Sequence, residues 1–358
     1  MSAVCGMVFF IACSTMRAAP ETADVLVSAV MQGGQPISAR CDSEGIIHVA
    51  CDSPDGPKYL RSVDGGRTFE APLDLVDQGS RQPGLEFNVW DLAVGRGGIV
   101  HVALGTNAWK LKLPKEEWGF FYTRLKPGET SFSRLQNINH KPSEGFSLAV
   151  DKKGNVAACW LADKLYVNVS HDDGASFGPA VEIDRSFNPC NCCTTSSTYA
   201  VDGRLAIFYR EETNDERDMF LALWNDERGE VARTKVSRSS WKTDSCPMTY
   251  YSVCATPDGF VAAWPTKGRI RFARLDRAGQ VLPPGEVTTP GQCGIRTGLV
   301  VLSDDRGNTL VAWKKDGKLA WQLYDKTGGP AGDAGSALSS GNGAAGVVTK
   351  DGRFVLFR

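Results

Sequence analysis

Five cysteines have the residue type and spacing most suited to chemistry in this chain. Three of them form a Cys-x-Cys-Cys segment, Cys190, Cys192 and Cys193, and two more follow further along, Cys246 and Cys293. Cysteine pairs can form disulfides, and cysteine thiolates can bind soft metal ions such as Cu(I) and Zn²⁺. The residue types therefore indicate either a disulfide framework or a copper or zinc site.

The disulfide and the metal interpretation each predict specific partners for these cysteines. A disulfide should link the 190–193 segment to Cys246 or Cys293, because a bridge between segments distant in sequence gains most from loop closure. A metal site would use the Cys-x-Cys-Cys segment to wrap one ion, with the other cysteines, Met248 or His140 as further ligands. The spacing does not match the paired C-x₂-C pattern of zinc fingers, and no C-x-x-C-H haem motif occurs.

Repeated strand pairs must position these cysteines. An apolar strand, a tight Asp/Gly turn and a second strand rich in Val, Ala and aromatics recur seven times, at 38–50, 90–103, 147–160, 198–209, 252–264, 299–313 and 345–357. Asp and Gly suit such hairpins because they tolerate the positive φ that primed turns require. This self-similarity predicts an all-β fold, a β-propeller, with seven blades favoured and six as the alternative.

The last strand pair ends at the C-terminus, so its blade must take a strand from elsewhere. Residues 24–31 form a strand-like run, and we expect them to pair with 345–358, which removes an open sheet edge. In a propeller, the segment before each innermost strand lies at one mouth of the central channel. The cysteines precede three consecutive strand pairs, so we expect all five on one rim of that mouth.

Two turns after third strands share the pattern Ser-x-Asp-x-Gly-x-[Ser/Thr]-Phe. The matching residues are Ser62, Asp64, Gly66 and Phe69 in one copy and Ser170, Asp172, Gly174 and Phe177 in the other. The Asp can accept backbone N–H bonds within the turn, and Gly can take the left-handed position. The pattern resembles the Asp-box of the sialidase-like (BNR-repeat) propellers, and the Cys-x-Cys-Cys segment is similar to that of a bacterial exported subgroup of unassigned function.

The resemblance implies what a sialidase active site would need. Exo-sialidases clamp a sugar carboxylate with three arginines and use a Tyr nucleophile with a Glu partner and an Asp acid/base. The candidates in this chain are Arg210, Glu211, Arg217, Asp218, Tyr250 or its neighbour Tyr251, and Arg296. The Arg-Ile-Pro element of the family is replaced by Gln-Pro-Ile-Ser-Ala-Arg at 35–40, which disfavours catalysis.

The N-terminal residues differ in composition from the rest. Residues 1–20 are a short apolar stretch and a polar linker, which is typical of a secretory signal, and 21–358 are expected to form a single sialidase-like propeller. The residues before Ser14 resemble a lipobox, in which Cys13 would be lipidated. The predicted location is therefore extracytoplasmic, either as a periplasmic or outer-surface lipoprotein or as a secreted protein. Eleven cysteines agree with an oxidising compartment.

Two functions stay open. The favoured one is an exported, non-catalytic binding or interaction module whose cysteine-rich channel mouth binds a glycan, a protein or a metal. The alternative is an exo-sialidase-type glycoside hydrolase with a diverged active site. The net charge of −1, with both signs interspersed, gives no footprint for nucleic acid, and a membrane would be reached only through a lipid anchor at Cys13.

Overall fold

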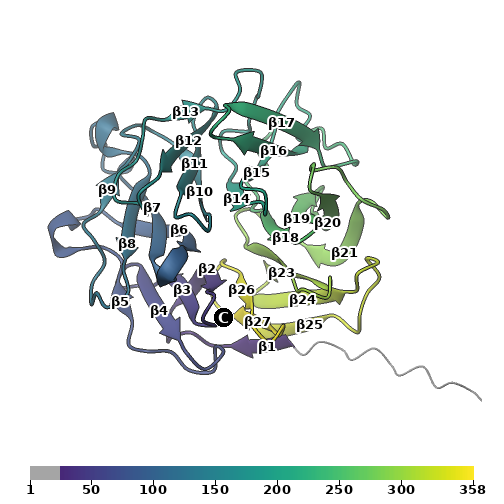
Figure 1. Ribbon diagram of the computed structural model, residues 1–358, viewed down its shortest axis with the longest axis horizontal. Coiled ribbons are helices and arrows are strands. Elements are labelled where there is room, and N and C mark those ends of the chain that lie inside the picture. The colour runs from purple at the N-terminus through teal and green to yellow at the C-terminus, as the bar shows by residue number, and fades with distance from the viewer. Residues whose placement is uncertain (1–24) are drawn as a thin grey trace, which may run out of the picture.

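Seven small β-sheets radiate around a central axis in the computed structural model, which describes residues 25–358 (Figure 1). Six of the sheets have four strands in sequence order, and the seventh has three. We number the blades in chain order, from blade 1 (β2–β5) to blade 6 (β22–β25), and blade 7 holds β26, β27 and β1. The prediction of a seven-bladed all-β propeller is confirmed, and the six-bladed alternative is wrong.

The innermost strands line the axis, and each contacts the innermost strands of the two neighbouring blades. They are β2 (Gln35–Cys41), β6 (Phe87–Val94), β10 (Glu144–Val150), β14 (Thr195–Tyr199), β18 (Ser252–Thr256), β22 (Leu299–Ser303) and β26 (Ala345–Val348). Because every blade repeats one topology, these strands all run the same way along the axis. The residues that precede them therefore gather at one end of the channel, which we call the mouth.

The second strands are the most apolar, since both of their faces pack against neighbouring blades. They are β3 (Ile47–Asp52), β7 (Val100–Thr106), β11 (Val156–Leu161), β15 (Leu205–Arg210), β19 (Gly259–Thr266), β23 (Thr309–Lys315) and β27 (Phe354–Phe357). Every residue of β11, β15 and β19 is buried. Hydrophobic clusters fill each blade junction, and the largest fully buried side chains include Trp160 and Trp264. Burial of these aromatics is a main source of the packing energy.

The third and fourth strands complete the blades toward the outside. The third strands are β4 (Lys58–Ser62), β8 (Phe121–Leu125), β12 (Leu165–Ser170), β16 (Met219–Asn225), β20 (Arg269–Asp276) and β24 (Lys318–Tyr324). The fourth strands are β5 (Leu73–Asp74), β9 (Gln136–Asn137), β13 (Val181–Glu182), β17 (Glu230–Lys235), β21 (Val287–Gln292) and β25 (Gly335–Leu338). Three short 3₁₀ turns, Gln78–Ser80, Arg96–Gly98 and Lys115–Glu117, lie in connections. The third strands are still largely buried, as in β12 and β16, whereas fourth strands such as β17 and β25 are exposed because they form the outer edge of the blade.

The ring is closed by the N-terminal strand β1 (Val25–Ser28), which pairs in parallel with β27. The register places Val25 opposite Phe354 and Ser28 opposite Phe357. Arg358 extends the pairing, since its N–H donates to Ser28 O at 2.9 Å and its carbonyl accepts from Val30 N at 3.1 Å. Figure 1 shows the purple N-terminal strand beside the yellow C-terminal blade. The predicted pairing of 24–31 with 345–358 is confirmed, because the C-terminal strand pair alone would leave an unpaired edge.

Candidate functional site

The Cys-x-Cys-Cys segment connects β13 to β14 at the mouth and is held by the end of β15. The Cys190 N–H donates to the carbonyl oxygen of Arg210 at 2.9 Å, and the Cys193 N–H donates to Cys190 O at 3.0 Å, which closes a tight turn. Cys246 approaches from the β17–β18 connection of the next blade. Two blades thus contribute cysteines to one place, and their connections cross the junction between blades 4 and 5.

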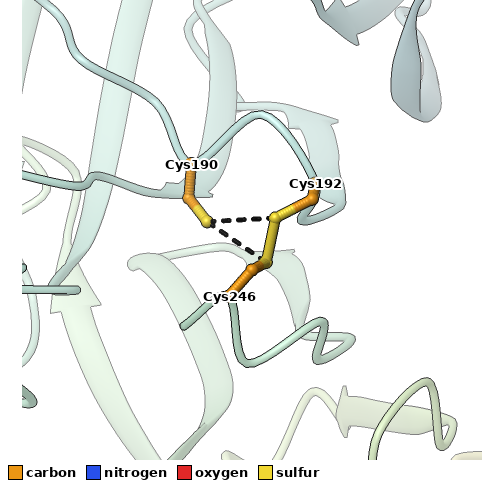
Figure 2. A group of neighbouring side chains, drawn as sticks. All are labelled: Cys190, Cys192 and Cys246. Carbon is orange, nitrogen blue, oxygen red and sulfur yellow. Dashed lines mark hydrogen bonds between the residues drawn. A yellow bond between two sulfur atoms is a disulfide. The ribbon is translucent and has the colours of Figure 1, made fainter. Parts of the chain in front are cut away.

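Four sulfur atoms meet at this junction. Cys192 and Cys246 form a disulfide with a Cα–Cα distance of 6.7 Å. The Cys190 sulfur lies 3.8 Å from that of Cys192 and 3.5 Å from that of Cys246 (Figure 2). It also lies 3.2 Å from the Cys193 sulfur, which in turn lies 3.9 Å from that of Cys246. The predicted staple between the 190–193 segment and Cys246 is confirmed. We call these four residues the cysteine cluster.

Cys293 does not join the cluster. It is a free cysteine of the described residues 25–358, and it packs against the hydrophobic core between blades 5 and 6. The reason is the pairing of β20 with β21, which continues to Gln292, while the Cys293 N–H donates to Gly268 O at 3.3 Å. Cys293 is therefore held at the hairpin end of blade 5, and the expected rim of five cysteines is reduced to a cluster of four.

Metal-ligand geometry is restricted to the cluster. In the part of the chain that the structure describes, Cys190, Cys192 and Cys246 are the one group of three or more His, Cys, Asp or Glu residues with ligand atoms all within 4.8 Å of one another. His140 lies outside that group, in the connection from β9 to β10. The cluster could hold a metal ion, although two of its sulfurs are bonded to each other.

The electrostatics of the cluster centre on Cys190. The Cys193 thiol donates to its sulfur, and Arg217 Nη1 donates to the same atom at 3.1 Å. The hydrogen bond from Cys193, together with the guanidinium groups of Arg217 and Arg210, lowers the pKa of Cys190 below its usual value. The same hydrogen bond and burial raise the pKa of Cys193. Of the two, Cys190 is the cysteine whose thiolate form the surroundings favour.

Arg210 is fully buried and serves as a tie between blades. Its Nη1 donates to Arg217 O at 2.7 Å, and its Nη2 donates to Pro265 O at 2.8 Å and lies 3.4 Å from Thr249 Oγ1. Pro265 belongs to β19 of blade 5, whereas Arg210 ends β15 of blade 4. These guanidinium donors are used by the protein itself.

The acidic neighbours of the two arginines are also paired within the fold. Both carboxylate oxygens of Glu211 accept from Arg233 Nη1 at 2.8 Å. Asp218 pairs with Lys235 at 2.5 Å and accepts a hydrogen bond from Ser237 at 3.3 Å. Of the six sequence-predicted catalytic candidates, these two face the blade 4 surroundings and not the channel.

The last two candidates lie on the channel. A cavity of about 660 Å³ follows the axis and is lined by the innermost strands of all seven blades, with Tyr250 and Arg296 at the mouth. Arg296 is exposed and donates its N–H to Met248 O at 2.8 Å, so its connection is fixed to the one that carries Cys246. The structure thus brings Tyr250 and Arg296 together and keeps Arg210 apart from them. Tyr251 is buried; its hydroxyl donates to Thr194 O and accepts from the Arg210 N–H at 3.1 Å.

Sequence reasoning missed two acidic residues at the same mouth, Asp52 and Glu144. Asp52 ends β3, lines the cavity and accepts the Val89 N–H at 2.8 Å, and burial raises its pKa to about 6. Burial also raises the pKa of Tyr250; Arg296 opposes this increase, and Asp52 and Glu144 add to it. The sequence could have indicated both residues, because Asp52 ends a second strand and Glu144 begins an innermost strand. A propeller brings both of these strand ends to the mouth.

The two Ser-x-Asp turns, residues 62–69 and 170–177, lie far from this chemistry, between the third and fourth strands of blades 1 and 3. Asp64 accepts the N–H groups of Arg67 and Thr68 at 3.0 and 2.9 Å, and the Ser62 hydroxyl donates to it at 2.8 Å. In the other copy Asp172 accepts from the Ser176 N–H at 2.9 Å and from the Ser170 hydroxyl at 2.7 Å.

Glycines and aromatics complete both of these turns. Gly66 and Gly174 have φ of 84° and 75°, the left-handed conformation expected of them. Phe69 packs edge-on against Phe357, and Phe177 packs edge-on against Tyr122. The motif Ser and Asp side chains bond within each turn, whereas other groups of the turns contact neighbouring blades: Gly66 O accepts from the Ser28 hydroxyl, and the Asp173 carboxylate accepts from Arg96 Nη2 at 2.6 Å.

Cys13, the expected lipidation site, lies outside the described residues. Within residues 25–358, no helix has the length and apolar character needed to cross a bilayer.

Comparisons with known proteins give the fold and no family. No protein-family model and no curated protein matches the chain. Among solved structures, it is similar to a protein of unknown function from Dyadobacter fermentans (TM-score 0.55, 15% identity, covering 88% of this chain and 97% of that chain). It is also similar to the α-L-arabinanase of Penicillium chrysogenum complexed with arabinobiose (TM-score 0.56, 14% identity, covering 85% of this chain and 98% of that chain). A third similar structure is a polysaccharide lyase of family PL25, an ulvan lyase (TM-score 0.54, 13% identity, covering 89% of this chain and 86% of that chain). At these identities the likeness establishes the propeller fold alone.

Proposed function

We propose that this chain is an exported, sialidase-like propeller that acts as a non-catalytic binding module and takes a glycan at its channel mouth. The observation that carries the proposal is the cavity of about 660 Å³ along the axis, which lies within the size range of ligand-binding pockets. Trp90 and Tyr250 offer aromatic surface there, and Asn88 and Arg296 offer hydrogen-bond donors. Such a mixture of aromatic and polar groups suits a sugar ring. The arabinanase and the ulvan lyase act on glycans, which agrees with this ligand class.

The hydrogen bonds that Arg210 makes within the protein favour binding over catalysis. Its Nη donors contact protein oxygens, so a carboxylate clamp of Arg210, Arg217 and Arg296 would have to break buried hydrogen bonds first. Breaking such bonds costs roughly 1–3 kcal/mol for each group left unpaired. Arg296 alone of the three lines the cavity, and one arginine can hold an anionic sugar without turning it over.

Binding should be measured on a glycan array and then by calorimetry with the strongest ligand. Arg296→Ala should weaken binding at least about 10-fold, because it removes a charge-assisted contact. Arg306→Ala is the matched control, since Arg306 is an exposed arginine of the same blade in the turn at the opposite end of the channel. Unchanged affinity in Arg296→Ala, or an equal loss in the control, would contradict a site at the mouth.

The second candidate is an exo-sialidase-type hydrolase. It is favoured by the charged groups around Tyr250: Arg296 lowers the pKa of the Tyr250 hydroxyl, and Asp52 and Glu144 raise it. A fluorogenic sialoside provides the test. We expect no turnover from the wild-type chain; turnover that Tyr250→Phe abolishes would establish this function and replace the first. Substitution of Arg210, Arg217 or Arg296 would then identify any clamp.

Export and lipidation belong to the same proposal. A lipid on Cys13 would tether the propeller to a membrane surface, with the glycan or a protein partner bound at the mouth. Labelling with a radioactive fatty acid in a bacterial host should mark the wild-type chain and not Cys13→Ser. Recovery of an unlabelled wild-type chain from the extracytoplasmic fraction would instead support simple secretion.

We also propose that the cysteine cluster holds copper or zinc. Zinc–sulfur bonds of about 2.3 Å place tetrahedral sulfur ligands about 3.8 Å apart. The observed separations of 3.8, 3.5, 3.2 and 3.9 Å lie close to that value. Thiolate sulfur is also the ligand type that Cu(I) prefers.

A further inference from the structure

The Cys192–Cys246 disulfide joins two of the four sulfurs of the cysteine cluster, whose other separations are near those of sulfur ligands around one metal ion. Four cysteines define six sulfur pairs; four of these pairs are 3.2, 3.5, 3.8 and 3.9 Å apart, and a fifth, Cys192–Cys246, is a covalent bond. A sulfur that shares a disulfide cannot act as a thiolate ligand. In the oxidised chain, the cluster therefore retains two thiol ligands, Cys190 and Cys193.

We propose that the Cys192–Cys246 disulfide is a redox gate on a four-thiolate metal site, so that the cluster binds metal when reduced and releases it when oxidised. This inference rests on the proposed metal site and adds its control. The ligands of the closed site are Cys190, Cys192, Cys193 and Cys246, and its metal is a soft d¹⁰ ion, Zn²⁺ or Cu(I).

The two halves of the gate differ in access. Cys192 and Cys246 are partly exposed, whereas Cys190 and Cys193 are buried. A reductant in solution can therefore reach the disulfide, while the two remaining thiols are shielded from oxidants by the surrounding core. Cys192 and Cys246 are therefore the pair that changes its redox state, and Cys190 and Cys193 are the ligands that stay as thiols.

A local cation suits the reduced state. Four thiolates around Zn²⁺ carry a net charge of −2, and an uncompensated buried charge is costly. Arg217 Nη1 lies 3.1 Å from the Cys190 sulfur and can donate to it in both states. Hydrogen bonds of this kind to ligating atoms orient the ligand and stabilise its charge.

The reaction balances without any further cofactor. A dithiol reductant supplies two electrons and two protons, the Cys192–Cys246 sulfur–sulfur bond breaks, two thiols form on the chain, and the reductant becomes a disulfide. Each thiol that then binds the metal releases its proton to solvent. Oxidation by a disulfide runs the same steps backwards and expels the ion.

The gate lies beside the proposed glycan site. Thr194 follows Cys193 directly and lines the channel cavity, and Tyr251 donates its hydroxyl to Thr194 O. Met248 is two residues from Cys246, and its carbonyl accepts the Arg296 N–H. Both chain segments that change their sulfur bonding are therefore joined to residues of the mouth.

The test compares two redox states of the full chain. Air-oxidised protein and protein reduced anaerobically, each freed of reductant by gel filtration, are titrated separately with Zn²⁺ and with Cu(I) against a chromophoric chelator. Thiol titration should count two more thiols per chain after reduction, as one disulfide requires. We expect one ion per reduced chain and at least about 100-fold weaker binding by the oxidised chain, since two of the four ligands are lost.

Variants distinguish the gate from the metal site. Cys246→Ser cannot form the disulfide and should bind metal equally with and without reductant, through the three remaining cysteines. Cys293→Ser removes a mouth-side cysteine outside the cluster and should keep the full redox difference. Co²⁺ bound to the reduced wild-type chain should show the d–d absorption of a tetrahedral thiolate site.

Each failure has its own meaning. Equal binding by both redox states would overturn the gate and leave the metal proposal standing. Absence of binding in both states would overturn the gate and the metal site together. Loss of the redox difference in Cys293→Ser would show that the gate uses a different disulfide and would overturn this assignment. Glycan binding is measured independently and is affected by none of these outcomes.

Discussion

The two Ser-x-Asp turns join the third and fourth strands of blades 1 and 3, whereas the cysteine cluster lies in connections that lead from one blade to the next, and the two kinds of connection are stabilised differently. In each turn, the Ser and Asp side chains bond to atoms within the same eight-residue segment, at 62–69 and at 170–177. In the cluster, Cys192 bonds to Cys246 across a sequence separation of 54, and Arg210 donates to Pro265 in the next blade.

The difference separates local from cross-blade stabilisation. The motif Ser and Asp can be repeated unchanged in any blade, because their side chains bond within their own turn. A cross-blade contact depends on which side chains two different connections bring together, so it occurs at one junction. Changes in the cross-blade set should therefore affect both stability and chemistry, whereas changes in the turns should affect only the local hairpin.

The largest effect should come from Arg210. Arg210→Leu removes a hydrogen bond to Pro265 O across the blade 4–5 junction and one to Arg217 O within blade 4, and it should lower the free energy of unfolding by about 4 kcal/mol. Chemical denaturation measures this change. Arg217→Leu is the comparison, because Arg217 is only half-buried and makes one carbonyl contact, to Thr243 O at 3.3 Å. If both variants lost the same stability, the cross-blade role of Arg210 would be wrong.

The next effect should come from the disulfide. Replacing both Cys192 and Cys246 by Ser should lower the free energy of unfolding of the oxidised chain by about 3 kcal/mol, because the bridge closes a long loop. The wild-type chain should lose a similar amount in the presence of reductant and without metal. Cys293→Ser should cost about 1 kcal/mol or less, since that cysteine forms no bridge. If reductant left the free energy of unfolding of the wild-type chain unchanged, the predicted stabilisation by the Cys192–Cys246 disulfide would be wrong.

The smallest effect should come from the turns. Asp64→Ala and Asp172→Ala should each lower the melting temperature by less than the other two changes do, and by similar amounts. Hydrogen bonds within the turn lower the pKa of both carboxyls. Their stabilisation is therefore present above the unfolded-state pKa of about 3.9 and is lost as the pH falls below it. Melting curves at pH 7 and in acid should show each variant converging on wild type at low pH.

Sequence reasoning succeeded where a feature repeats. The period of the strand pairs predicted seven blades, and the missing strand in the C-terminal blade predicted the contribution of 24–31. The expectation that Cys190–Cys193 would be bridged to another connection also followed from the repeat. The separate expectation that all five cysteines would gather was wrong for Cys293, because the length of β21 and not the repeat decides where blade 5 ends.

Side-chain roles within a site were harder to predict than the fold. Arg210 ends a second strand and Arg296 precedes an innermost strand, so the repeat leads both arginines to the mouth, yet one is buried among carbonyls and the other is exposed on the cavity. Asp52 was passed over although its position leads to the mouth. A shift of one residue along a strand moves a side chain to the opposite face of the sheet, and only the packing of neighbouring blades shows which groups it meets there.

The sequence by itself determined the β-propeller, its closure, the self-contained turns and the presence of cysteines at one mouth, since all four depend on period and local hydrogen bonding. Only the tertiary structure decided that Cys192 bonds to Cys246, that Arg217 donates to Cys190 and that Cys293 stays apart. The physical reason is range. Strand and turn formation depends on neighbours along the chain, whereas the contacts of the cysteine cluster depend on where two connections from different blades end in space.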